Sequence, residues 1–126
     1  MTLGTERCKI TIDLPNGLYV FDNTSATGKT RLYKELIKLK AYGSNVAAYT
    51  YNDKLLGHPI ENTLNSGADI ILLDRYDMYS GEGVDVIERI MTDCIILVDC
   101  KKIPDTLPNF DGCFIEMTRD SIEVFQ

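Results

Sequence analysis

The sequence lacks several features that would assign the protein to a specialised class. It contains no Trp, one His and four Cys, and no two cysteines form a Cys-x-x-Cys pair. A zinc site of paired cysteines is therefore excluded, because such sites need closely spaced Cys and His ligands. We expect the cysteines to be buried free thiols.

The chain also lacks a long apolar run and an excess of basic residues. No apolar segment approaches the roughly 18 residues needed to span a bilayer, and residues 1–7 lack the pattern of a signal peptide. Thirteen basic and nineteen acidic residues give a formal net charge of -6, which opposes phosphate-led binding to nucleic acids or anionic membranes. We expect a cytoplasmic protein with neither a membrane nor a nucleic acid as partner.

The composition that is present is typical of one globular domain covering residues 1–126. With 44% hydrophobic and 25% charged residues, a chain of this length can bury a core without disulfides or a structural metal. Apolar runs alternate with helical periodicity, which is typical of an α/β fold. We expect a mostly parallel sheet with helices on both faces, with an added leading strand and an added C-terminal β-hairpin.

The expected elements follow from apolar alternation, continuous apolar runs and turn residues. The turn residues Pro15, Asn16 and Gly17 predict that the first two strands form a leading hairpin. Strands are expected at 9–14, 18–21, 45–51, 68–74 and 94–99, helices at 29–42, 60–66 and 84–91, a loop at 52–59, and a hairpin at 113–117 and 121–125.

The most informative segment reads N-T-S-A-T-G-K-T. It matches the phosphate-loop pattern G-x-x-x-x-G-K-[ST] at every fixed position except the first, where Asn replaces Gly. The segment follows an expected buried strand and opens an expected helix, so its backbone N–H groups would converge on an anion. It predicts a nucleotide site made by Asn23, Thr24, Ser25, Ala26, Thr27, Gly28, Lys29 and Thr30. The alternative is a helix start that Thr27 merely caps.

Magnesium would be held beside this loop. Lys29 would reach the β and γ phosphates of the nucleotide, and the hydroxyl of Thr30 would bind Mg²⁺. Asp74 ends the apolar run 70–73, a position that supplies a second magnesium ligand in such sites. The alternative is an ordinary strand that happens to end in an acid.

From the strand at 18–21 to Asp99, the order of these motifs resembles that of the P-loop NTPase superfamily. The resemblance implies a nucleotide-binding core similar to those of ABC-type and recombinase-type ATPases. Those cores often carry a catalytic Glu directly after the second-motif Asp, where this chain has Arg75. The triplet Asp74-Arg75-Tyr76 resembles instead the D-R-Y/H segment of thymidylate and deoxynucleoside kinases.

Other polar groups have both a chemical and an ordinary interpretation. Asp77 could orient a water molecule near a γ phosphate, and Arg75 could neutralise charge on the transferred phosphoryl group. Alternatively, Asp77 is a solvated carboxylate and Arg75 pairs with a surface acid. Asp99 could sense the γ phosphate or simply end a strand. The tyrosines near strand ends could stack on a base or lie at the edge of the core: Tyr49, Tyr51, Tyr76 and Tyr79.

These observations predict Mg²⁺-dependent binding of a nucleoside triphosphate, with slow or partner-stimulated hydrolysis. ATP is the default because no guanine-reading motif is present. Lys29, Arg75 and Asp77 are the candidate catalytic residues, and a protein partner or a second copy would complete the site. Two alternatives stay open. One is a small nucleoside or nucleotide kinase, and the other is a degenerate phosphate-loop module that acts through protein interactions or inhibition.

Overall fold

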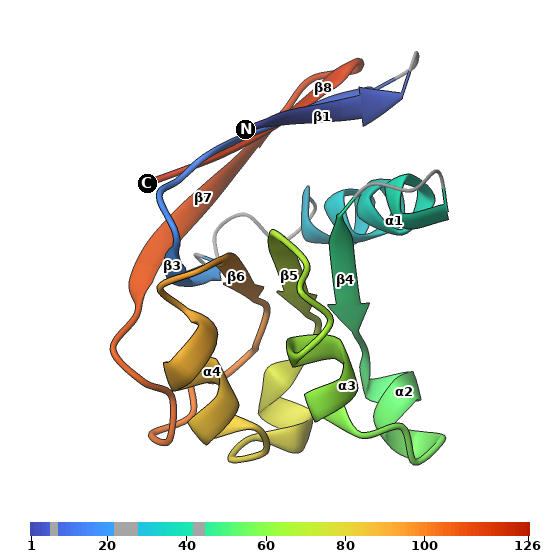
Figure 1. Ribbon diagram of the computed structural model, residues 1–126. Coiled ribbons are helices and arrows are strands. Elements are labelled where there is room, and N and C mark those ends of the chain that lie inside the picture. The colour runs from blue at the N-terminus through green and yellow to red at the C-terminus, as the bar shows by residue number, and fades with distance from the viewer. Residues whose placement is uncertain (6–7, 22–27, 42–44) are drawn as a thin grey trace.

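One mixed sheet organises the structure, a computed structural model that describes residues 1–5, 8–21, 28–41 and 45–126 (Figure 1). The order of strands across the sheet is β1-β2-β8-β7-β3-β6-β5-β4. The strands are β1 (Thr2–Thr5), β2 (Cys8–Asp13), β3 (Gly17–Phe21), β4 (Val46–Tyr49), β5 (Ile70–Leu73), β6 (Ile95–Val98), β7 (Asp111–Met117) and β8 (Ser121–Phe125). The helical elements are α1 (Gly28–Ala41), α2 (Tyr51–Leu55), α3 (Ile60–Leu64), α4 (Val84–Ile90) and the 3₁₀ helix η2 (Tyr76–Tyr79).

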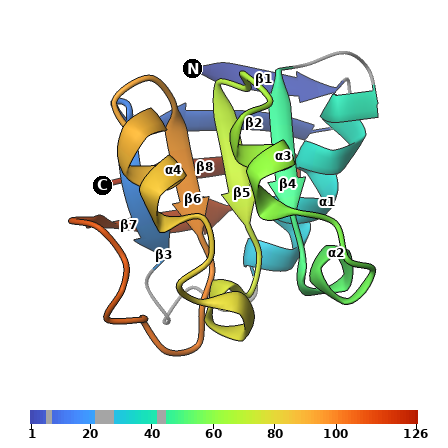
Figure 2. The ribbon, with the colours of Figure 1, turned by 60° about the horizontal axis from the view of Figure 1, so that its bottom comes forward.

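The sheet has two halves with different strand directions. In one half, β3, β6, β5 and β4 pair in parallel, and β7 joins the free side of β3 in the same direction. In the other half, which we call the ribbon, β7 pairs with β8 and β2 with β1 in antiparallel fashion, while β8 and β2 are parallel. Figure 2 shows the ribbon strands running across the parallel strands.

The expected fold class is therefore wrong. In place of a mostly parallel α/β sheet of the P-loop type, the eight strands form a mixed sheet that curls into a half-barrel, with the ribbon lying over α1 (Figure 1). The described helices are few, and α2, α3 and α4 are short, at five to seven residues each. The reason is that the strands near the two ends of the chain are not additions to a complete sheet but part of the eight-stranded sheet itself. They form the ribbon through antiparallel and parallel pairs, and the ribbon joins the parallel half through β7 and β3.

The predicted leading hairpin is also wrong. The strands on either side of Pro15 lie in different halves of the sheet, because β2 pairs with β1 and β8 whereas β3 pairs with β6 and β7. The connecting residues bind the segment before β6 instead. The Gly17 N–H donates to the Cys94 carbonyl at 3.0 Å, and the Asn16 side chain donates to the Thr92 carbonyl at 3.4 Å.

Two apolar clusters hold the sheet. Inside the curl, the α1 leucines pack against the inward side chains of the ribbon and of the parallel strands, a set that includes Leu32, Leu36, Leu39, Ile10, Ile12, Ile122 and Val124. On the opposite side, α3, α4 and η2 cover the parallel strands with Ile60, Leu64, Tyr76, Tyr79 and Ile87. Strands β5 and β6 face both clusters, so every residue in them is buried.

Several local features complete the fold. The expected hairpin at 113–117 and 121–125 is present as β7 and β8, and the four cysteines are buried and form no disulfide, as expected. The expected loop at 52–59 instead begins with α2, which Thr50 caps by accepting a hydrogen bond from the Asp53 N–H at 3.0 Å. No helix in the described ranges is long and apolar enough to cross a membrane.

We expect the contact between α1 and the two halves of the sheet to be the main source of stability. Leu36 is fully buried in this contact, so Leu36→Ala should lower the free energy of unfolding by about 3 kcal/mol, measured by urea denaturation. Its neighbour Ile37 is 39% exposed and serves as the matched control, since Ile37→Ala should cost less than about 1 kcal/mol. Equal losses in the two variants would contradict the packing described here.

Candidate site at the carboxyl ends of the parallel strands

The carboxyl ends of β3, β6, β5 and β4 lie at one edge of the parallel half, which Figure 2 brings forward. Residues 22–27 link the end of β3 to the start of α1, Asp74 follows β5, and Asp99 follows β6. Strand β6 lies between β3 and β5 in the sheet. Ligands of parallel sheets commonly bind at such an edge, where connections leave in opposite directions.

The predicted phosphate loop is only partly covered by the structure. Asn23, Thr24, Ser25, Ala26 and Thr27 lie outside the described residues. The backbone of Gly28, Lys29 and Thr30 forms the start of α1, as the motif requires, but their side chains also lie outside the described part. The roles predicted for Lys29 and Thr30 therefore stay predictions.

Main-chain hydrogen bonds fix the corner that carries Asp74. Its N–H donates to the Tyr49 carbonyl at 2.9 Å, which joins the ends of β5 and β4. The Tyr79 hydroxyl donates to the Asp74 carbonyl and lies 3.3 Å from the Tyr49 carbonyl. Asp74 itself is half-buried. The Tyr79 hydroxyl thus contacts the main chain at the ends of two neighbouring strands, β4 and β5.

The charge of Asp74 acts on a residue of α1. Burial raises the pKa of Tyr33, a half-buried α1 residue, and the negative charges of Asp53 and Asp74 raise it further. A hydrogen bond with Thr50 acts in the opposite direction on that pKa. Tyr33, Asp53 and Asp74 are therefore electrostatic neighbours, drawn from α1, α2 and the end of β5. This contact was not predicted, because no sequence pattern links the three positions.

Three of the tyrosines considered for base stacking are structural. The ring centroids of Tyr49 and Tyr79 are 5.1 Å apart, and those of Tyr76 and Tyr79 are 5.3 Å apart, both in edge-to-face geometry. Their hydroxyls donate to main-chain carbonyls, Tyr49 to His58 and Tyr76 to Glu82. Burial raises the pKa of each of these tyrosines, and for Tyr79 the raised value lies well above the ordinary range.

Arg75 and Asp77 interact with each other at the same edge. Arg75 is the one non-glycine residue in the described part of the chain with a positive φ, at 53°. Its Nε lies 3.4 Å from Oδ1 of Asp77, which also accepts a hydrogen bond from the Lys101 N–H at 3.3 Å. The two candidate catalytic residues are thus paired, and the pair connects η2 to the segment after β6.

A depression of about 450 Å³ opens beside this pair. It is lined by Asp77, Ser80 and the loop at 102–106. No sequence pattern indicated this depression. Lys102 and the hydroxyls of Ser80 and Thr106 give this depression polar groups that could contact a ligand.

Within the ranges that the structure describes, no group of three or more His, Cys, Asp or Glu residues could hold a metal ion. The predicted magnesium site does not need such a group, because it would use Thr30, Asp74 and the phosphates of the nucleotide.

Comparisons of the chain with protein-family models, curated proteins and solved structures found no match.

The buried tyrosine corner predicts a loss of stability at alkaline pH. Because the folded state raises the pKa of Tyr79 above its ordinary 10.0, stability is complete below that pH and falls as pH rises above it. Urea denaturation across this range should show the fall, and Tyr79→Phe should make it shallower while lowering stability at neutral pH by about 1 kcal/mol. Tyr51→Phe, at the exposed start of α2, controls for the removal of one tyrosine. An unchanged slope in Tyr79→Phe would contradict this assignment.

Proposed function

We propose that the protein binds a nucleoside triphosphate with Mg²⁺ at the carboxyl ends of β3, β6 and β5, and hydrolyses it slowly or when a partner stimulates it. The observation that carries the proposal is the segment N-T-S-A-T-G-K-T between a buried parallel strand and the start of α1. A loop of this sequence at a helix start directs backbone N–H groups and a lysine toward phosphates.

The surroundings of Asp74 support a magnesium site. Thr30 precedes Tyr33 by three residues in α1, a spacing that brings two helix positions to one face. The negative charge of Asp74 raises the pKa of Tyr33, so Asp74 is within electrostatic reach of α1. Thr30 and Asp74 would hold the metal, and bound Mg²⁺ would offset the charge of the phosphates.

The pairing of Arg75 with Asp77 favours a second candidate, a nucleotide-binding module with no turnover of its own. The Asp77 carboxylate already accepts hydrogen bonds from the Arg75 guanidinium and the Lys101 N–H, so it has fewer lone pairs left to hold an attacking water. The same pair also supports partner-stimulated hydrolysis, because a partner that draws Arg75 toward the phosphates would release Asp77 to orient water. Phosphate release measured with and without a candidate partner separates the two functions.

Lys29 provides the first test. Titration calorimetry with ATP and Mg²⁺ should show binding to the unaltered protein and a roughly ten- to hundredfold weaker affinity for Lys29→Ala, since a charged hydrogen-bond donor to phosphate is lost. Lys34→Ala, which removes an exposed lysine from the same helix, is the matched control and should bind normally. If the two variants bind ATP equally well, the phosphate-loop proposal is refuted.

Asp74 tests the metal site separately. Asp74→Asn should weaken nucleotide binding in the presence of Mg²⁺ by about tenfold and leave metal-free binding nearly unchanged, because only the metal ligand is altered. Asp77→Asn is the control at the same edge, and its binding affinity should be kept in both conditions. An equal effect of Asp74→Asn with and without Mg²⁺ would remove Asp74 from the metal shell while leaving the phosphate loop in place.

A further inference from the structure

Helices α3 and α4 cover one side of the parallel strands. The same side of the sheet extends onto the ribbon, where no described helix covers it. The residues of β2, β8 and β7 alternate, so that Ile10, Ile12, Ile122 and Val124 point into the cluster around α1. The intervening residues point outward, where no described helix packs on them. We call this surface the outer ribbon face and define it by Asp13, Phe114, Glu116, Glu123 and Phe125.

Strand register arranges the outer ribbon face in two rows. Asp13 is opposite Phe125, which is opposite Phe114, and the two rings lie with centroids 6.0 Å apart. In the next row, Glu123 is directly opposite Glu116. Phe114 is 40% exposed although it belongs to a central strand of the sheet. An aromatic pair flanked by carboxylates therefore lies open to solvent.

Negative charges outnumber positive charges on this face. Like charges directly opposite in an antiparallel pair destabilise it, yet β7 and β8 carry glutamates at these positions. Within the described part of the chain, the side chains of Asp13, Glu116 and Glu123 form no ion pair or hydrogen bond. Lys9 adds one positive charge farther along β2, and the Met1 ammonium, which donates to the Ile12 carbonyl at 3.0 Å, adds another at the edge of the depression. A shallow depression of about 550 Å³ runs along the acidic side chains and Phe125.

We propose that the outer ribbon face binds a basic segment of a partner protein. Lysine or arginine side chains of the segment pair with Glu116, Glu123 and Asp13, and an apolar side chain between them covers the two phenylalanines. Charge complementarity selects this occupant, because a second copy presenting the same acidic face would be repelled, as would nucleic acid.

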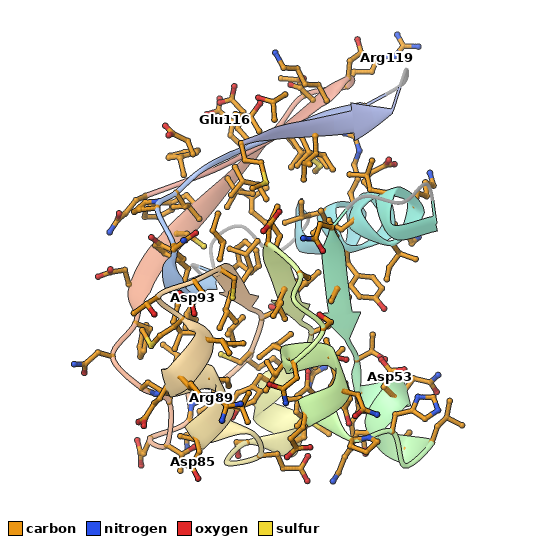
Figure 3. All side chains as sticks on the ribbon, in the orientation of Figure 1. Asp53, Asp85, Arg89, Asp93, Glu116 and Arg119 are labelled. Carbon is orange, nitrogen blue, oxygen red and sulfur yellow. The ribbon has the colours of Figure 1, made fainter. Side chains whose placement is uncertain are left out.

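This surface is separate from the carboxyl-end site. Figure 3 shows Glu116 on the curled ribbon and Asp53, which neighbours Asp74 through Tyr33, near the other end of the molecule. Binding at the outer ribbon face therefore goes beyond the proposed nucleotide site, and either proposal can fail without the other.

The test is an NMR titration of the full chain labelled with ¹⁵N. Three synthetic peptides of equal length are added in separate experiments: one alternates Lys and Leu, the second Lys and Ser, and the third Glu and Leu. The Lys-Leu peptide should shift the amide resonances of β2, β7 and β8, the Lys-Ser peptide should bind more weakly, and the Glu-Leu peptide should not bind. Raising the salt concentration should weaken Lys-Leu binding, because exposed ion pairs are screened.

Matched variants identify the residues. The double variant Glu116→Gln with Glu123→Gln should bind the Lys-Leu peptide roughly tenfold more weakly. The control variant, Glu61→Gln with Glu88→Gln, makes the same charge change on α3 and α4 and should bind the peptide normally. The first double variant should also unfold at a higher urea concentration than the unaltered protein, because the repulsion between the glutamates is removed. Lost binding is then not a result of unfolding.

Phe114→Thr keeps a strand-forming residue and removes the aromatic ring. It should reduce the affinity for the Lys-Leu peptide to that for the Lys-Ser peptide. Equal weakening by both double variants, resonance shifts confined to other elements, or dimerisation of the free protein through this face would each overturn the proposal.

Discussion

The pairing of β2 with β8 is the constraint on which the rest of the structure depends. These strands come from opposite ends of the described chain, and they are parallel from Lys9 to Asp13 and from Ser121 to Phe125. Strand β7 turns directly into β8, and β7 also pairs with β3. The pairing of β2 with β8 therefore connects the ribbon to the parallel half of the sheet. The sheet must therefore curl, and the space inside the curl is filled by α1. The leucines of α1 are buried because strands from both ends of the chain meet over them.

This constraint gives the two halves of the sheet different surfaces. Strands β5 and β6 are buried on both sides, and main-chain hydrogen bonds connect their ends. The Asp99 N–H donates to the Leu73 carbonyl, and the Tyr76 N–H donates to the Asp99 carbonyl, each within 3 Å. The ribbon strands are buried on one side, which leaves their outer residues free to carry charge and aromatic rings. The two proposed sites differ accordingly, since the carboxyl-end site is built at the ends of buried strands and the outer ribbon face lies on exposed side chains.

Local elements could be predicted from the sequence where the pattern itself decides the structure. Continuous apolar runs identified β5 and β6, and helical spacing identified α1 and α4. Partners of strands could not be predicted in this way, because the alternation in β2 shows that one side is buried but not which strand lies beside it. The leading hairpin was mistaken for that reason. Helix α2 was missed because it buries none of its residues, and only the Thr50–Asp53 capping box marks it. Of the candidate site, the strand ends were predictable, whereas the neighbours of Asp74 depend on tertiary packing.

The backbone at Arg75 shows how that packing sets the site. A left-handed conformation costs a non-glycine residue about 1 kcal/mol, so it persists only where its neighbours compensate. Here the following N–H binds the Asp99 carbonyl, and the guanidinium pairs with Asp77. The turn directs η2 beneath the strand ends and brings the Tyr79 hydroxyl to the Asp74 carbonyl. These hydrogen bonds fix the main chain at Asp74. In the proposed site, a main chain that folding has already ordered lowers the free energy needed to position Asp74 for a metal.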